Sequence, residues 1–454
     1  MLFSVEDQKL YGQENLKVIS QIVYDGLKKT KEHIVIREVV LEVGDTLTQA
    51  ELNVALERSV QNIKNLRLFL NISSEVLPLP ENNVMILFTL SERFYTLPAP
   101  IFTFEEPNFS TWWKDKDFER TSYGLEIFQR NLRGRNETVV ARAKLGFTQS
   151  LSFSYHIPYI NKNQKLGMSI RTFYKQKDDV VYTTQNNERL FFRDQNQKSK
   201  EERFLGMGIT FRRALYNFHE SNLSYRNIEI SDSLRSLNPD YLLNGKTKRE
   251  YLTLFYRWIN SRTDYNAYPL EGRIAEVKIT KFGLGLFNAD YNLLTLRPTY
   301  SHYQKVKDKI WFHTKVAFKY SWFKKLPYNL QEGLGFGETF VRGYEFYIID
   351  GQHYSLLRNN LKFALLTNRK LKIPLVKSEK IKQVPFALYF NFHNDLGYTW
   401  DNLSGRNNPL SNRLMRGSGA GMDLVTGYDQ VFRFEYSIND RSETGLYFSY
   451  RKSI

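Results

Sequence analysis

Apolar and polar residues alternate along most of the chain, beginning near residue 95. The segment 311–323 shows the pattern best. Mostly aromatic and aliphatic side chains fill one set of alternate positions, and basic or small polar side chains fill the other. Successive side chains of a β-strand point to opposite faces, so such a segment has one face suited to lipid and one suited to water. The same alternation recurs at 139–147, 151–157, 205–212, 386–393 and 432–436.

The alternating segments number about sixteen, and a tilted transmembrane strand needs ~9–11 residues. A soluble β-sandwich also alternates, but it explains neither the aromatic residues at the segment ends nor the Arg, Lys and Glu in mid-segment. We therefore predict a mainly β fold, a 16-stranded antiparallel transmembrane β-barrel. Its strands are expected to begin near 97, 121, 137, 149, 165, 202, 216, 248, 271, 290, 309, 354, 384, 416, 429 and 443. Long polar stretches at 175–202, 231–247 and 367–383 are expected to be external loops.

Residues 1–93 follow a different pattern, with a short N-terminal lead and then the order β-α-α-β-β. Strands are expected at 17–24, 66–77 and 83–90, and a helix within 32–40. A second helix carries an apolar stripe from Leu47 to Val60, and Asp45 or Thr46 can cap it. The sequence thus predicts two domains: a small two-layer α+β domain at 1–93 and the barrel at 94–454.

Composition excludes several classes of protein. The chain has no Cys, so disulfides, thiol catalysis and Cys-ligated zinc are excluded. No apolar run approaches the ~18–20 residues of a membrane-spanning helix, and an aromatic content of 15% argues against disorder. The net charge of +16 could indicate a nucleic-acid partner, but the basic residues are spread along the whole chain. Basic loops facing anionic lipid explain the charge equally well, so we predict no nucleic-acid partner.

Residue types that carry chemistry form no recognisable catalytic or metal-binding constellation. The seven His lack metal-ligand spacing, and the Gly-rich stretch 333–337 is not followed by Lys-Ser or Lys-Thr. We therefore predict no catalytic residue, no metal, no cofactor and no enzymatic activity.

Several motifs resemble those of one family of membrane proteins. Gly26, Thr30 and the runs 36–38, 44–45 and 65–69 resemble a POTRA domain, the periplasmic module that precedes the barrel in the BamA/TamA family. The run 338–344 contains the family's VRG(F/Y) motif, and 392–398 resembles its F-x-D-x-G motif with one extra residue before the Asp. Asp264, Tyr268-Pro269 and Gly272 resemble its D-x-x-x-YP-x-x-G hairpin. The resemblance covers essentially the whole chain and is closest to single-POTRA, BamA/TamA-like outer-membrane proteins of Bacteroidota-type bacteria.

The resemblance implies a lumenal loop, here 324–353, in which Arg342 pairs with Asp395. Asp395 shares its alternate positions with Asn391 and His393, which places it on the polar face. A bidentate Arg–carboxylate pair would fix the position of the loop. The alternative is a surface Arg without a partner. The expected residues of this lock are Val341, Arg342, Gly343, Tyr344, Asp395 and Gly397.

The resemblance also implies a function in the outer membrane, with the N-terminal domain in the periplasm. It implies insertion or translocation of polypeptide through a barrel with a weak lateral seam, and client binding by the POTRA domain. The partners would be unfolded or secreted polypeptides, outer-membrane lipid, and accessory periplasmic or lipoprotein subunits. A dedicated secretion pore for one partner and a passive structural barrel stay open as alternatives. The expected seam and last-strand residues are Gly417, Gly419, Gly421, Tyr447, Phe448 and Tyr450.

The first six residues contain no basic region, apolar core or small-residue cleavage site of a signal peptide. A secreted barrel requires such a signal. A mature chain with an added Met, a misassigned start and a removed upstream domain are the alternatives.

Overall fold

The computed structural model describes residues 16–104, 118, 121–287, 291–372, 383–403, 408–426 and 429–452. The chain divides into two units, Met1–Arg93 and Phe94–Ile454. In the described part of the chain, no helix has the length and apolar character needed to cross a membrane.

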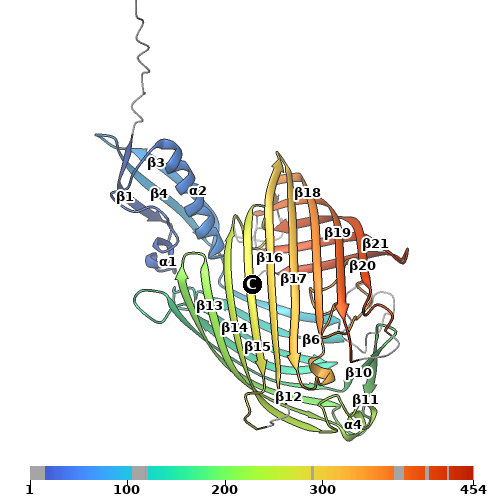
Figure 1. The fold of residues 1–454 in the computed structure, drawn as a ribbon. Coiled ribbons are helices and arrows are strands. Elements are labelled where there is room, and N and C mark those ends of the chain that lie inside the picture. Colours follow the sequence, from blue (N-terminus) through green and yellow to red (C-terminus); the bar gives the residue numbers. More distant parts are fainter. Residues whose placement is uncertain are drawn as a thin grey trace, which may run out of the picture. The chain divides into compact units, whose positions relative to one another are not determined.

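The first unit packs two helices on a four-stranded sheet of strand order β2-β1-β4-β3 (Figure 1). Its core consists of fully buried aliphatic and aromatic side chains, among them Ile19, Ile34, Leu52, Ile63 and Phe88. Strand β2 contains only two residues and was not predicted. The elements are β1 (Lys17–Asp25), α1 (Glu32–Ile36), β2 (Thr46–Leu47), α2 (Gln49–Asn65), β3 (Phe69–Pro78) and β4 (Asn83–Glu92).

The prediction that Asp45 or Thr46 caps α2 was wrong. The N-cap is Thr48, whose side chain accepts a hydrogen bond from the backbone N–H of Glu51, while the Glu51 carboxylate accepts one from the N–H of Thr48. This reciprocal capping box satisfies two backbone donors that the helix leaves without partners. Thr46 lies instead in β2, opposite Val18.

A buried carboxylate ties the end of β4 to the turn that follows β1. Glu92 accepts hydrogen bonds from the backbone N–H groups of Lys28, Lys29 and Thr30 at 2.7 to 3.2 Å. Burial opposes ionisation of Glu92, but these donors outweigh it and hold its pKa below the ordinary value. The ionised form of Glu92 therefore stabilises the first unit.

The second unit is a single antiparallel sheet of sixteen strands, curled into a barrel wall (Figure 1). This confirms the predicted fold class. The largest shift from the predicted strand starts is at β16, which begins at Leu293 rather than near 290. The strands are β5 (Thr96–Phe104), β6 (Thr121–Arg130), β7 (Thr138–Gly146), β8 (Thr148–Ile157), β9 (Leu166–Lys177), β12 (Lys200–Ala214), β13 (Asn217–Ile230), β14 (Lys248–Thr263), β15 (Gly272–Phe282), β16 (Leu293–Lys307), β17 (Ile310–Phe323), β18 (His353–Lys372), β19 (Gln383–Trp400), β20 (Leu414–Thr426), β21 (Gln430–Asn439) and β22 (Thr444–Lys452).

The alternation of side chains distinguishes the two faces of this wall. On β17, Trp322 and Phe318 are 48% exposed, whereas Lys319 and Ser321 are buried. Exposed apolar side chains on the outer face are expected where lipid takes the place of water, and the polar side chains line the lumen.

The described parts of the three predicted external loops do not all lie at one end of the sheet. Strands alternate in direction, so every second connection lies at the end where β5 begins. Strand β18 ends and β19 begins at this end, so the described residues of 367–383 lie there, and 373–382 lie outside the described residues. The stretch 175–202 forms a hairpin at the opposite end, β10 (Asp179–Gln185) with β11 (Glu188–Arg193), and 231–247 at that end contains the helix α4 (Asp232–Leu237).

We expect Glu92→Gln to destabilise the first unit by about 1–3 kcal/mol, because an amide oxygen replaces a carboxylate that accepts three backbone N–H groups. The folded-state pKa of Glu92 is depressed, so its contribution is present above the unfolded-state pKa and lost as pH falls through the folded-state value. Limited proteolysis of the full chain between pH 7 and pH ~3 measures this. Glu81→Gln, at the exposed turn between β3 and β4, is the control. Equal protection of the Glu92 variant and wild type would contradict the assignment.

Candidate functional site

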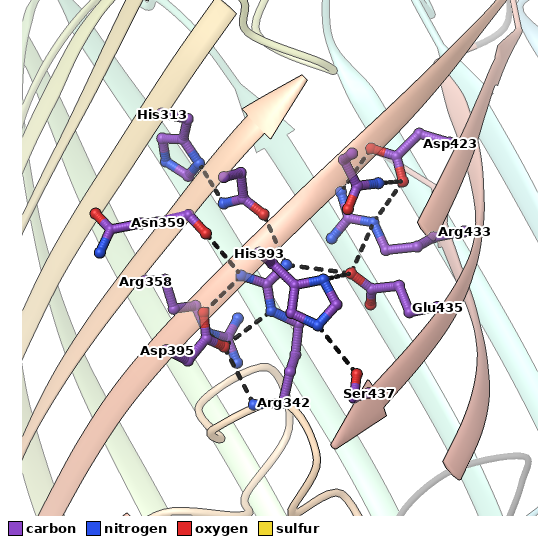
Figure 2. Close-up of polar contacts among 12 residues, drawn as sticks. His313, Arg342, Arg358, Asn359, His393, Asp395, Asp423, Arg433, Glu435 and Ser437 are labelled. Atoms are coloured by element: carbon purple, nitrogen blue, oxygen red, sulfur yellow. Dashed lines mark hydrogen bonds and ion pairs between the residues drawn. The ribbon is translucent and has the colours of Figure 1, made fainter. Parts of the chain in front are cut away.

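The lumenal loop, 324–352, joins β17 to β18 and contacts lumen-facing side chains of β18, β19 and β21. Apart from a 3-10 turn at Tyr328–Leu330 and two isolated bridges, it contains no helix or strand. Its position is therefore determined by side-chain contacts. Arg342 of the VRG(F/Y) motif supplies several of them (Figure 2).

Arg342 and Asp395 form a bidentate ion pair (Figure 2). The Arg342 Nε donates to Asp395 Oδ2 at 2.8 Å and Nη2 donates to Oδ1 at 2.6 Å. The backbone N–H of Arg342 donates to Oδ2 as well, at 3.1 Å. The side chains are 4% and 0% exposed, so solvent screens this pair little.

Groups on β18 and β21 accept the remaining hydrogen bonds of the Arg342 guanidinium. Its Nη1 donates to Asn360 Oδ1 on β18 at 2.7 Å and to Glu435 Oε1 on β21 at 3.1 Å. Arg358 lies 3.5 Å from Asp395, and its guanidinium also donates to the backbone oxygen of Phe340. The motifs did not point to Asn360, Arg358 or Glu435. Strand parity could have placed them on the polar face, but nothing in the sequence pairs them with Arg342.

The other motif residues pack the loop against the wall. Val341 and Tyr344 are fully buried in an apolar cluster with Leu356 and Met415. A Cβ atom at Gly397 would lie 2.3 Å from Val341 Cγ2, so only glycine fits at Gly397 without a shift of Val341.

Two further contacts join the loop to the turn between β21 and β22. Gly343 has a φ of +92° and turns its carbonyl toward Asn439, whose Nδ2 donates to it at 2.8 Å. The Tyr344 hydroxyl donates to Asp440.

Burial raises the pKa of Glu345 in the same loop to about 8, and the nearby Glu435 adds to this shift.

The glycines assigned to the seam lie elsewhere. Gly417, Gly419 and Gly421 face the lumen on β20, which β21 and β22 separate from the end of the sheet. A Cβ atom at Gly417 would lie 1.7 Å from the backbone oxygen of Arg342. Cβ atoms at Gly419 and Gly421 would collide with backbone oxygens of β21. These glycines therefore make room for the lumenal loop and for the close approach of β21.

The predicted residues of the last strand divide between the two faces. Tyr447 faces the lumen, where its ring centre lies 5.4 Å from that of Phe346 in the loop. Phe448 and Tyr450 lie on the other face, where they pack against Phe434 and Phe432 of β21. Tyr447 thus belongs to the loop contacts, and Phe448 and Tyr450 to the outer wall.

A second polar cluster holds the hairpin between β14 and β15 against the last strands. The Tyr268 hydroxyl donates to Asp423 Oδ2 at 2.6 Å, and Arg433 Nε donates to Asp423 Oδ1 at 2.7 Å. The Lys362 ammonium lies 3.8 Å from the centre of the Tyr268 ring. The D-x-x-x-YP-x-x-G motif pointed to this hairpin, but it did not identify a partner for the tyrosine.

Strands β5 and β22 are the two ends of the sheet, and no pairing joins them in the part of the chain that is described. The backbone oxygen of Tyr95 accepts from Arg130 N at 2.7 Å, so odd-numbered residues of β5 direct their backbone groups toward β6. Even-numbered residues face the outer edge. Pro98 and Pro100 are among these, so the edge lacks two successive N–H donors.

The arrangement can position and hold a loop. Three guanidinium groups, of Arg342, Arg358 and Arg433, face the carboxylates of Asp395, Glu435 and Asp423 (Figure 2). Among the described residues, no group of three or more His, Asp or Glu could hold a metal ion.

The sequence model of the Omp85 superfamily domain matches residues 131–452. The chain belongs to the Omp85 superfamily. No curated protein matches it. Barrels of the superfamily are outer-membrane proteins, and this supports an outer-membrane location for this member and a general function in protein insertion or secretion.

Two solved structures show the same fold. BamA from Haemophilus ducreyi lacking POTRA domains 1–3 is 14% identical with a TM-score of 0.52, and the match covers 96% of this chain and 84% of that one. CdiB from Escherichia coli is also 14% identical with a TM-score of 0.55, and the match covers 96% of this chain and 76% of that one.

We expect Arg342→Ala to lower the stability of the barrel by about 1–3 kcal/mol, because it strands the buried Asp395 with only Arg358 nearby. The heat-modifiability of the barrel on gels and the protease sensitivity of the lumenal loop measure the effect. The matched control is Arg413→Ala, which removes a half-exposed guanidinium 3.6 Å from Asp440. An Arg342 variant that melts and resists protease like the control would refute the lock.

Proposed function

We propose that this Omp85 member inserts or translocates polypeptides at the outer membrane by opening the sheet between β5 and β22. The observation that carries the proposal is the edge of β5. It retains backbone acceptors, but Pro98 and Pro100 remove two donors, so β5 and β22 cannot form a complete ladder. An incomplete ladder costs less to open than a continuous one. An extended client strand could then add to an opened edge by β-augmentation.

In this proposal the first unit is a periplasmic POTRA domain that receives the client. Its two helices, its four-stranded sheet and the motif residues around Gly26 and Thr30 support this assignment. Strand β3 is at the edge of the sheet and spans ten residues, which is long enough to pair with an extended peptide. Outer-membrane lipid and accessory periplasmic or lipoprotein subunits are the further partners.

Site-specific photocrosslinking in cells tests the proposal directly. We expect a photoreactive residue in place of Tyr450 on β22 to capture polypeptide clients. One in place of Leu223 on β13 should capture few, although the two side chains have similar exposure, 49% and 48%. Equal capture at both positions would contradict a specific seam. Capture of one secreted protein alone would favour a dedicated secretion pore. Steady conductance without crosslinks would identify a passive barrel.

The prolines of β5 give a second prediction. The double variant Pro98→Val, Pro100→Val restores two N–H donors at the edge and should strengthen the seam, at about 0.5–1.5 kcal/mol per added hydrogen bond. We expect a higher unfolding temperature on heat-modifiability gels and less client crosslinking. Ala99→Val is the matched control, because it adds the same side chain at a residue whose N–H already points toward β6. A double variant that behaves like this control would exclude a role for the prolines in the seam.

A further inference from the structure

Two arginines lie side by side on the outer face of the barrel wall, at the end of the sheet where β5 begins. Arg262 of β14 and Arg273 of β15 are directly opposite each other in the ladder that joins these strands. Alternation places both on the outer face, because Leu254 and Ile279, at positions of the same parity on the two strands, are 46% and 36% exposed. Both arginines are themselves exposed.

This placement brings two like charges together. Residues directly opposite each other in an antiparallel pair have Cβ atoms about 4.5–5.5 Å apart, and like charges there destabilise the pair. In the described part of the chain, neither guanidinium forms an ion pair or a hydrogen bond. That of Arg262 lies 5.6 Å from the centre of the Tyr216 ring, a cation–π contact that restricts the side chain without neutralising its charge. The other strand neighbour of Arg273 is His302 of β16, not a carboxylate.

The acidic residues nearest to the two arginines in sequence have other partners. Asp264 accepts hydrogen bonds from the backbone N–H groups of Leu270 and Glu271 within the hairpin between β14 and β15. The Glu271 carboxylate lies 3.4 Å from the indole nitrogen of Trp311, a lumen-facing residue of β17.

The outer face around the two arginines also carries no carboxylate. Among the described residues, Asp and Glu are absent from the outward-facing positions of β12 to β16 in the half of the wall nearest this end, within 207–213, 217–223, 256–262, 273–277 and 300–304. The positive charge of Arg262 and Arg273 is therefore left for a partner outside the chain.

The level of the two arginines in the membrane follows from the aromatic residues beside them. Trp258 lies four residues before Arg262 on β14, and Tyr300 lies two residues before His302 on β16; both face outward. Outward-facing aromatic side chains of a membrane barrel mark the boundary between hydrocarbon and headgroups. Arg262 and Arg273 lie beyond this boundary, so they are at the level of the lipid headgroups.

The outer face of β15 continues from Arg273 into the hydrocarbon with aliphatic side chains. Ala275, Val277 and Ile279 follow it at alternate positions, and Trp258 lies opposite Val277 on the neighbouring strand. A ligand that combines a negative charge with an extended apolar chain therefore fits this surface better than a free anion does.

We propose that Arg262 and Arg273 bind the phosphate of an anionic phospholipid. Two guanidinium forks offer planar sets of donors that match phosphate oxygens, and the negative charge between them relieves their repulsion. The acyl chains lie along the aliphatic side chains of β15. This inference rests on the proposed function for the orientation of the barrel, in which this end is periplasmic, and it assigns a site to one of the proposed lipid partners.

Quenching of Trp258 fluorescence by brominated lipid tests the inference on the full-length protein in phosphatidylcholine vesicles. The difference between matched proteins with and without Trp258→Phe isolates the signal of this residue. We expect brominated phosphatidylglycerol to reach half-maximal quenching at an about tenfold lower mole fraction than brominated phosphatidylcholine. The preference should fall at about 0.5 M sodium chloride, because salt screens the charges.

Three variants assign the preference to the two arginines. Arg262→Gln, Arg273→Gln should lose it, whereas Arg262→Lys, Arg273→Lys keeps both charges and should retain most of it. The control Lys248→Gln, Lys281→Gln removes two outward-facing cations from the same two strands at the opposite end of the sheet, and should leave the preference unchanged. Heat-modifiability gels verify that each variant is folded.

Three results would overturn the inference: equal quenching by the two brominated lipids, equal loss of preference in the Gln variant and the control, or loss of the preference in sodium phosphate but not in sodium chloride of the same ionic strength. The last result would assign the site to a free phosphate. Failure of the proposed function is distinguishable, because photocrosslinking at the Tyr450 position reports on clients and not on lipid. Lipid preference without crosslinks would leave a phospholipid site on a barrel that does not insert clients.

Discussion

The buried ion pair between Arg342 and Asp395 is the interaction on which the position of the lumenal loop depends. Removing two ions from water costs several kcal/mol per ion, so such a pair is tolerated only when its other hydrogen-bonding positions are also satisfied. Here the Arg342 backbone N–H, Asn360 and Glu435 complete the set. A loop with almost no regular structure depends on such side-chain contacts to hold one position in the lumen.

Two sets of contacts act on the same group of strands. The first is the ion pair of Arg342 and Asp395 in the lumenal loop, and the second is the contact of Tyr268 in the β14–β15 hairpin with Asp423. The first reaches β18, β19 and β21, and the second reaches β20 and β21. Arg433 connects them, because it binds Asp423 and lies 3.9 Å from Glu435. Strands β18 to β21 are therefore braced from the lumen by the lumenal loop and by the hairpin between β14 and β15. In this part of the lumen the guanidinium groups of Arg342, Arg358 and Arg433 each lie close to a carboxylate.

Much of the fold was predictable because one face of each transmembrane strand must suit lipid. This requirement makes apolar and polar residues alternate, and the alternation is visible in the sequence. The pair Arg342–Asp395 was predictable from motifs, and parity agreed with it. Alternation along a strand assigns a side chain to one face of the sheet, but it does not identify the residue that this side chain contacts. The contacts of Arg342 with Asn360 and Glu435 were therefore not predicted. The glycines of β20 were misassigned for a related reason. A glycine weakens an isolated strand, but here its missing Cβ accommodates the Arg342 backbone, which only the tertiary structure reveals.

The edges of the sheet illustrate why backbone chemistry matters more than side chains at a seam. A ladder needs donors and acceptors at alternate residues of both strands, and proline keeps the acceptor while it removes the donor. Two prolines two residues apart act on the same edge, because residues of equal parity direct their backbone groups the same way. Had Pro98 and Pro100 been of opposite parity, one would have broken the ladder with β6 instead. Their spacing leaves the ladder between β5 and β6 complete and confines the loss of N–H donors to the outer edge of β5.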